Sequence, residues 1–254
     1  MLKIRIIPTI LYDEFKMVKG VNFNSWRTVG NIIQAIRIYK IREVDELILM
    51  DISATNKKKK INLELIKDIS EDSFMPLTFG GGINNIEQIS QIIKNGADKV
   101  SINTAATKDL DLIYKASNNF GSQCIVVSID YKVENNEMVI YSNSGEQRTK
   151  LNIIDYIKSV EEAGAGEILL TSIDKEGTMT GYDLKTIKYV SDNSKLPIIA
   201  SGGCGKPQDM VDLVKKAKVS GLAAASMYHF THYTPNDAKK NLENNGFPVR
   251  VKSI

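Results

Sequence analysis

Short runs of apolar and β-branched residues alternate along the chain with segments whose apolar positions recur at helical spacing. Several of the runs are apolar throughout, and this pattern is typical of strands that are covered on both faces. Eight such runs predict strands at residues 4–7, 46–51, 77–79, 99–102, 124–130, 167–171, 198–201 and 222–225.

Amphipathic helices are predicted between these strands. Ile32, Ile36 and Tyr39 fall on one helical face, and residues 86–93 and 153–160 show the same spacing of isoleucine and other apolar side chains. Eight strands, each followed by a helical segment, nearly fill the chain. The order of elements is typical of an α/β protein with a parallel sheet.

The predicted architecture is a single (β/α)₈ TIM barrel over residues 1–254, with a doubly wound open sheet as the alternative. An internal repeat favours the barrel. Residues 78–82 resemble residues 200–204, and residues 46–49 resemble residues 167–170, at an offset near 120 residues. Two fused half-barrels would produce this repeat. The expected halves are approximately residues 1–120 and 121–245.

Composition narrows the class of protein. Hydrophobic residues make up 43% and charged residues 25% of the 254 residues, which is typical of a globular protein. No apolar run reaches the ~18 residues that a membrane helix needs, and no secretory leader is expected. Two cysteines fit a reducing cytoplasm better than a disulfide framework. The lysine run 57–60 could bind nucleic acid or an anionic surface, but few aromatic residues lie near it, and a solvated loop is the simpler interpretation.

Glycine-rich turns follow the third and seventh predicted strands. Gly81 and Gly82 lie in the first turn, and Ser201, Gly202 and Gly203 lie in the second. Glycine lets backbone N–H groups approach a phosphate closely, whereas tight turns without a ligand are the alternative. The next strands lead into possible helix starts, which could add further N–H groups. These starts are Asn103–Thr104 and Ala225–Ser226. The pairing predicts a ligand with two phosphates.

Two aspartates end predicted strands. Asp130 ends the fifth strand and Asp51 ends the second, and the catalytic groups of this fold come from the carboxyl ends of strands. Each carboxylate could transfer protons or merely cap the following loop. Lys19 and Thr171 are further polar candidates on the same face. The two histidines have no metal-ligand spacing, so no metal is predicted. Proton transfer needs only side chains, so no cofactor is predicted either.

Four charged residues lie at the opposite, amino-terminal end of the predicted strands. Two are basic and two are acidic, so a ring across the bottom of the barrel is expected. The ring would be either a structural plug or a gate for a small molecule, and spacing does not choose between them. The four residues are Arg5, Glu46, Lys99 and Glu167.

These motifs together are similar to one known family. The sequence resembles the cyclase subunit of imidazole glycerol phosphate synthase, the HisF family, over nearly its whole length. The segments that carry the resemblance are residues 5–8, 18–23, 76–83, 96–106, 164–171 and 199–203.

The resemblance implies a reaction that uses two faces of the barrel. A glutaminase subunit at the amino-terminal face would release ammonia, which crosses the barrel and reacts with a bisphosphorylated ribulosyl-aminoimidazole carboxamide nucleotide. The four charged residues correspond to the family's ammonia gate, and Asp98 corresponds to a residue at the glutaminase interface. The resemblance assigns phosphate binding to Gly82, Asn103, Thr104, Gly177, Gly203 and Ser226.

One departure from the family affects its chemistry directly. The family uses two catalytic aspartates, and the second corresponds to Asp130. The first lies in a Cys-Leu-Asp sequence that reads Thr9-Ile10-Leu11 here. Leucine cannot transfer a proton, and removing one of a paired acid and base commonly lowers the rate by ~10²–10⁴. Asp13 is a candidate replacement. Glu176 also stands where the family has aspartate.

Three hypotheses follow from the resemblance and its departure. In the first, the chain delivers ammonia to a different acceptor, as in similar paralogues that work with a sugar amidotransferase making acetamidino groups on bacterial surface sugars. The likeness to these paralogues lies in Ile10, Leu11 and residues 43–47. In the second, the chain catalyses the cyclase reaction of histidine biosynthesis with an altered acid. In the third, it is a non-catalytic conduit that activates the glutaminase.

Overall fold

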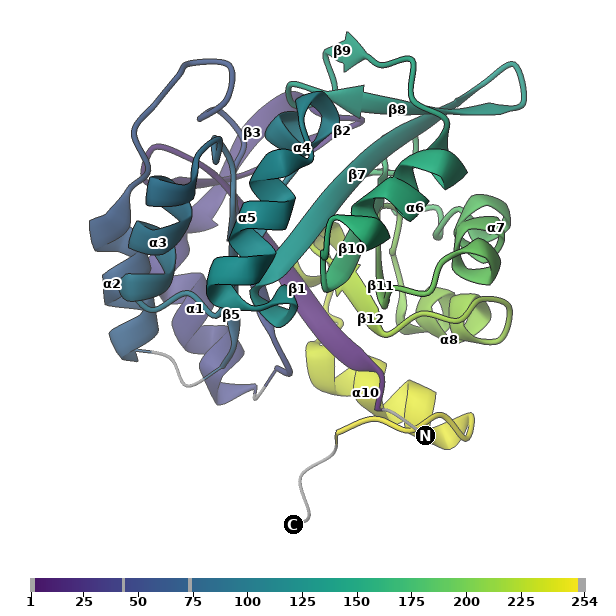
Figure 1. Ribbon diagram of the computed structural model, residues 1–254. Coiled ribbons are helices and arrows are strands. Elements are labelled where there is room, and N and C mark those ends of the chain that lie inside the picture. Colours follow the sequence, from purple (N-terminus) through teal and green to yellow (C-terminus); the bar gives the residue numbers. More distant parts are fainter. Residues whose placement is uncertain (1–2, 43, 73–74, 251–254) are drawn as a thin grey trace.

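The computed structural model describes residues 3–42, 44–72 and 75–250, and its centre is a closed parallel barrel (Figure 1). The strands pair in the order β10-β11-β12-β1-β4-β5-β6-β7, and a pairing of β7 with β10 closes the ring. This closure confirms the (β/α)₈ barrel and excludes the open sheet. The barrel strands are β1 (Arg5–Asp13), β4 (Leu47–Asp51), β5 (Leu77–Gly80), β6 (Lys99–Ile102), β7 (Ile125–Glu134), β10 (Glu167–Ser172), β11 (Ile198–Ser201) and β12 (Gly221–Ala224).

Helices cover the outside of the barrel, with their apolar faces against the strands (Figure 1). Side-chain caps fix several helix starts; Asn152, for example, accepts hydrogen bonds from the backbone N–H groups at the start of α6. The helices are α1 (Ile32–Ile41), α2 (Leu63–Asp72), α3 (Ile86–Lys94), α4 (Thr104–Lys108), α5 (Asp111–Phe120), α6 (Ile153–Glu162), α7 (Leu184–Asn193), α8 (Pro207–Val214), α9 (Ser226–Phe230) and α10 (Pro235–Asn244), with a short 3₁₀ turn at η1 (Ser122–Cys124). Within the described ranges, no helix is both long and apolar enough to cross a membrane.

Two hairpins extend the barrel beyond the predicted elements. β1 runs on to pair antiparallel with β2 (Lys16–Val21), which pairs with β3 (Asn24–Asn31). β7 runs on to pair with β8 (Glu137–Ser142), which pairs with β9 (Gln147–Arg148). Both extensions stand at the carboxyl end of the barrel strands, at the top of Figure 1. They extend the sides of the barrel at that end.

The barrel interior is packed in layers because alternate residues of each strand point inward. Six inward-facing apolar side chains form a compact cluster, separate from the larger core between strands and helices. The six residues are Ile7, Ile48, Val126, Leu169, Ile199 and Ala223. Polar and charged side chains lie on either side of this apolar layer.

Candidate active site

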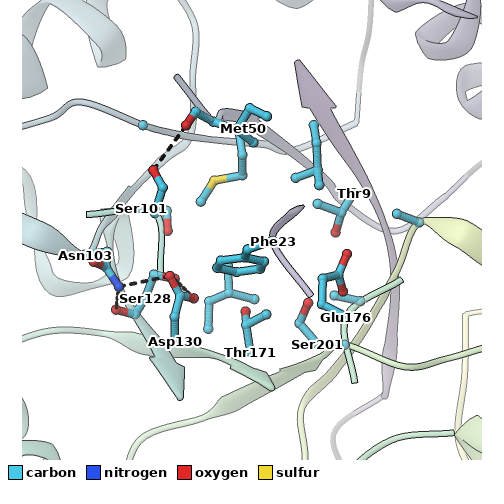
Figure 2. Close-up of a pocket in the computed structure, with 18 of the residues that line it drawn as sticks. Thr9, Phe23, Met50, Ser101, Asn103, Ser128, Asp130, Thr171, Glu176 and Ser201 are labelled. Atoms are coloured by element: carbon cyan, nitrogen blue, oxygen red, sulfur yellow. Dashed lines mark hydrogen bonds between the residues drawn. The ribbon is translucent and has the colours of Figure 1, made fainter. Parts of the chain in front are cut away.

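A pocket opens at the carboxyl end of the barrel, and it gathers most of the predicted site residues (Figure 2). Phe23 of the β2–β3 connection, Trp26 of β3 and Ser144 of the β8–β9 connection contribute to its lining. The predicted residues that line the pocket are Asp51, Gly81, Gly82, Asn103, Thr104, Asp130, Thr171, Gly177, Ser201, Gly202, Gly203, Ala225 and Ser226. The barrel therefore brings together residues that are far apart in the sequence.

Asp130 is held in a buried and defined position in this pocket. The side-chain amide of Asn103 donates to its Oδ2 at 3.1 Å, and the Ser128 hydroxyl donates to its Oδ1 at 3.3 Å. Burial raises the pKa of Asp130 to about 7, and hydrogen bonds from Ser128 and Thr171 act in the opposite direction. Near neutral pH this carboxyl group is therefore close to half protonated, which suits proton transfer in both directions.

Leu11 stands on the other side of the pocket from Asp130. β1 and β7 are separated by three strands along either path around the barrel, so they lie opposite one another. Leu11 lines the pocket from β1. The pocket therefore has a titratable carboxyl group on the β7 side and an apolar side chain on the β1 side.

Asp13 does not fill the place left at position 11. Its carboxylate accepts hydrogen bonds from Lys59 Nζ at 2.7 Å, Lys57 Nζ at 2.9 Å and Ser53 Oγ at 2.7 Å, and it does not line the pocket. These contacts hold the pKa of Asp13 well below its usual range. An aspartate that stays ionised at neutral pH cannot donate a proton, so the geometry argues against Asp13 as the replacement acid.

Asp13→Asn is expected to lower the free energy of unfolding by about 1 kcal/mol at pH 7 while turnover changes less than about twofold. Because the pKa of Asp13 is lowered in the folded state, its stabilising effect is present above the pKa of the unfolded chain and is lost as the pH falls below about 4. Urea unfolding at pH 7 and pH 3 measures the effect. A hundredfold loss of turnover would instead identify Asp13 as a catalytic acid.

Two glycine-lined cradles face one another across the pocket. Gly81 and Gly82 have φ angles of 107° and 72°, and Gly202 and Gly203 have φ angles of 96° and 100°. A Cβ atom on Gly203 would lie 2.2 Å from the carbonyl oxygen of Gly181. Only glycine allows both this backbone conformation and this close approach, which leaves backbone N–H groups accessible to an anion.

Gly203→Ala is expected to destabilise the protein by more than about 2 kcal/mol and to abolish its thermal stabilisation by inorganic phosphate. Gly246→Ala is the matched control, because Gly246 also has a positive φ, of 81°, but a Cβ there would meet nothing within 4 Å. The control is expected to cost about 1 kcal/mol and to keep the response to phosphate. Equal effects of the two variants would contradict a ligand role for the cradle.

Two of the polar candidates are already engaged within the protein. Lys19 is buried and pairs with the carboxylate of Glu176, and of these two residues only Glu176 lines the pocket. Asp51 Oδ1 accepts the backbone N–H groups of Ser53 and Ala54, both at 2.9 Å. Asp51 therefore caps the loop after β4 while also facing the pocket.

Several pocket residues escaped the sequence analysis. Phe23 lies in a hairpin whose strands were not predicted, so nothing in the sequence indicated that it reaches the pocket. The inward-facing side chains Thr9, Met50, Ser101 and Ser128 were overlooked because they lie inside strands. Alternation along each strand was the signal that could have found them.

The four charged residues predicted at the bottom of the barrel form a closed ring. Arg5 pairs with Glu46 at 2.6 Å and with Glu167, and Lys99 pairs with each glutamate at 3.0 Å. The exposed Asp98 lies beside this end, where its Oδ2 accepts the N–H of Leu77 at 2.8 Å. The apolar layer separates the ring from the pocket. A small neutral molecule crosses such a layer far more easily than an ion does.

The fold and the pocket define a class: a TIM-barrel protein with a candidate active site at the carboxyl ends of its strands, built from one titratable carboxyl group and two glycine cradles. Residues 5–234 match the family model described as "Histidine biosynthesis protein". The chain belongs to this family.

Individual relatives align with the chain from end to end. The chain is 44% identical over 251 residues to the Campylobacter jejuni protein named "Putative imidazole glycerol phosphate synthase subunit hisF2", an alignment that covers 99% of this chain and all of that protein. It is 40% identical over 253 residues to imidazole glycerol phosphate synthase subunit HisF of Dehalococcoides mccartyi, with all of both chains covered. The HisF subunit of Methanococcus maripaludis is 42% identical over 271 residues, covering 98% of this chain and all of that protein.

Proposed function

We propose that the chain is the synthase subunit of a glutamine amidotransferase. Ammonia released by a glutaminase subunit at the amino-terminal face crosses the barrel and reacts with a phosphorylated acceptor in the pocket at the other end. One observation carries the proposal: a ring of four charged side chains and a pocket with a titratable carboxyl group occupy opposite ends of one barrel, joined by an apolar layer. Ammonia is small and neutral, as passage through that layer requires.

The glutaminase docks, in this proposal, around the charged ring. Asp98 is exposed at this end of the barrel and offers a carboxylate to a partner. The charged ring acts as a gate that keeps water out until the glutaminase delivers ammonia. The names of the relatives, which are subunits of a synthase, support an assembly of more than one chain.

Asp130 is the proton-transferring residue of the proposed reaction. When ammonia attacks an acceptor carbon, the new amine carries a positive charge and must lose a proton. A carboxyl group with a pKa of about 7 accepts that proton and returns it to a leaving oxygen. The glycine cradles bind the acceptor's phosphate groups through backbone N–H donors.

The acceptor differs, we propose, from the nucleotide used in histidine biosynthesis. Leu11 stands in place of one of the two aspartates that the HisF reaction uses. The carboxylate of Asp13 pairs instead with Lys57 and Lys59. The role that fits is delivery of ammonia for the amidination of a bacterial surface sugar, together with a sugar amidotransferase.

The second candidate is the cyclase reaction of histidine biosynthesis. The observation that favours it is the alignment, because relatives at 40–44% identity over their whole length carry the name of imidazole glycerol phosphate synthase subunits. This candidate requires a bound water to replace the acid at position 11.

The discriminating experiment supplies free ammonia. The chain alone is incubated with the bisphosphorylated ribulosyl-aminoimidazole carboxamide nucleotide and saturating ammonium chloride at alkaline pH, and imidazole glycerol phosphate is measured. We expect the nucleotide to stabilise the protein thermally but to be turned over at least ~10²-fold more slowly than by a HisF with both aspartates. Leu11→Asp is the matched variant and should raise the rate. Unaided turnover at the rate of that HisF would assign the chain to histidine biosynthesis.

A further inference from the structure

Hydroxyl side chains form the floor of the pocket, directly above the apolar layer of the barrel. Figure 2 shows them around the pocket, with Asp130 and Phe23 among them. They lie on five different barrel strands, and on four of these strands the inward residue two positions earlier belongs to the apolar layer, whereas on β6 it is Lys99 of the charged ring. The five residues are Thr9, Ser101, Ser128, Thr171 and Ser201.

Two of these hydroxyls have no hydrogen-bond partner in the described part of the chain. Thr9 Oγ1 and Ser101 Oγ are both shielded from solvent and unpartnered. Ser128 and Thr171, in contrast, are engaged with Asp130. Buried polar groups in native proteins are almost always hydrogen-bonded, because leaving one unpaired destabilises the fold. Ser226 Oγ, which also lines the pocket, is unpartnered as well, and three such groups in one pocket point to a ligand that supplies the missing partners.

The side chains at the floor of the pocket restrict which chemical group of a ligand can bind there. A hydroxyl both donates and accepts, and neither Thr9 nor Ser101 carries charge. The apolar layer beneath Thr9 would leave an ionic group there without compensation. The floor therefore suits an uncharged N–H or O–H group.

Thr9 occupies an informative place on β1. It faces inward two residues before Leu11, so the strand presents a hydroxyl below the position where the family's first aspartate would stand. Where the resembling family has cysteine, whose thiol is a weak donor, this chain has a strong donor and acceptor. The chain thus lacks a carboxylate on this strand but has a neutral hydrogen-bonding group one layer deeper.

We propose that Thr9 and Ser101 are a pair of ligand-binding hydroxyls that hold an uncharged N–H or O–H group of a reactant at the floor of the pocket. This inference rests on the proposed function for the identity of the reactants. Two sources share the chemistry: ammonia that arrives through the barrel, and a hydroxyl of the phosphorylated acceptor. Thr9 binds and does not ionise, so the pH profile of the reaction belongs to Asp130.

Thermal stability without any ligand provides the first test. Thr9→Val keeps the shape of the side chain and removes a hydroxyl that has no partner, so Tm should stay unchanged or rise by a few degrees, and Ser101→Ala should behave alike. Thr78→Val is the matched control, because the equally enclosed Thr78 hydroxyl donates to Glu46 Oε1 at 2.8 Å. The control should lower Tm by several degrees. A similar fall in Thr9→Val would overturn the proposal.

Probe binding to the folded protein provides the second test and separates the two sources. Ribose 5-phosphate and inorganic phosphate are compared as ligands, and ammonium chloride is compared with potassium chloride at alkaline pH, each by its thermal shift. If the floor holds an acceptor hydroxyl, the preference for ribose 5-phosphate over phosphate should fall about fivefold or more in Thr9→Val. If it holds ammonia, the extra stabilisation by ammonium chloride should disappear instead. No difference in either comparison would overturn the inference. Neither test requires turnover, so failure of the proposed reaction would be seen separately.

Discussion

Asp130→Asn is expected to lower ammonia-dependent turnover by ~10²–10⁴-fold while the protein stays folded. Asparagine has nearly the same shape as aspartate, and its carbonyl oxygen can still accept the hydrogen bond that Asn103 donates at 3.1 Å. What the variant loses is a group that exchanges a proton near neutral pH. The measurement is the rate of product formation with saturating ammonium chloride, together with a circular dichroism spectrum.

The pH dependence of the reaction rate provides a second test of the same prediction. Because the pKa of Asp130 is about 7, the rate profile of the wild type should change slope near pH 7, and that change should be absent from any residual activity of Asp130→Asn. Burial raises this pKa in the folded state above its ordinary value of 3.8. The stability contributed by the protonated form is therefore complete below about pH 4 and is lost as the pH rises to about 7. Above pH 7 the asparagine variant should be more stable than the wild type, by on the order of 4 kcal/mol.

Asp174→Asn is the matched control for the carboxylate. Asp174 follows β10 and accepts the backbone N–H of Val133 at 2.9 Å, and it does not line the pocket. Its replacement should leave turnover within about twofold of the wild type. Full activity of Asp130→Asn would exclude proton transfer by Asp130 and would favour the hypothesis of a non-catalytic ammonia conduit.

Lys99→Met is expected to uncouple glutamine hydrolysis from product formation in the complex with the glutaminase. Lys99 joins Glu46 and Glu167 across the bottom of the barrel at 3.0 Å each. Without it the ring is open on one side, and water and ammonia can exchange there with solvent. The ratio of glutamate released to ammonia incorporated should rise several-fold above one, and assays of both products from one reaction measure it.

The same substitution should also destabilise the chain, because Glu46 and Glu167 keep only Arg5 as a cationic partner in the ring. Removing one partner of a largely buried ion pair costs about 2–4 kcal/mol. Lys188→Met is the control, because Lys188 forms an exposed pair with Asp192 at 2.7 Å, and its loss should cost less than about 0.5 kcal/mol. Unchanged stoichiometry in Lys99→Met would mean that the ring is a structural plug.

The barrel could be predicted from the sequence alone because the spacing of apolar residues in strands and helices is a local property. The predicted strands at residues 99–102 and 198–201 coincide with β6 and β11. The two hairpins were missed because a short hairpin strand depends on the strand beside it. Asn135 and Asn136, with φ angles of 49° and 66°, mark the β7–β8 turn, and these two asparagines were the available signal. The half-barrel repeat and the extent of the domain remain predictions.

The candidate active site, like the fold, has some features that the sequence predicts and others that depend on the structure. The residue types at the strand ends can be read directly from the sequence: Asp130 at one, leucine in place of aspartate at another, and glycine in two turns. How these groups behave depends on their three-dimensional surroundings. The tertiary structure closed four distant charges into a ring, turned Asp13 toward Lys57 and Lys59, and left Thr9 and Ser101 without partners. The reason is physical: residue identity and alternation are written along one strand, whereas a pKa, an ion pair or an unpaired hydroxyl depends on groups that other strands bring within a few ångströms.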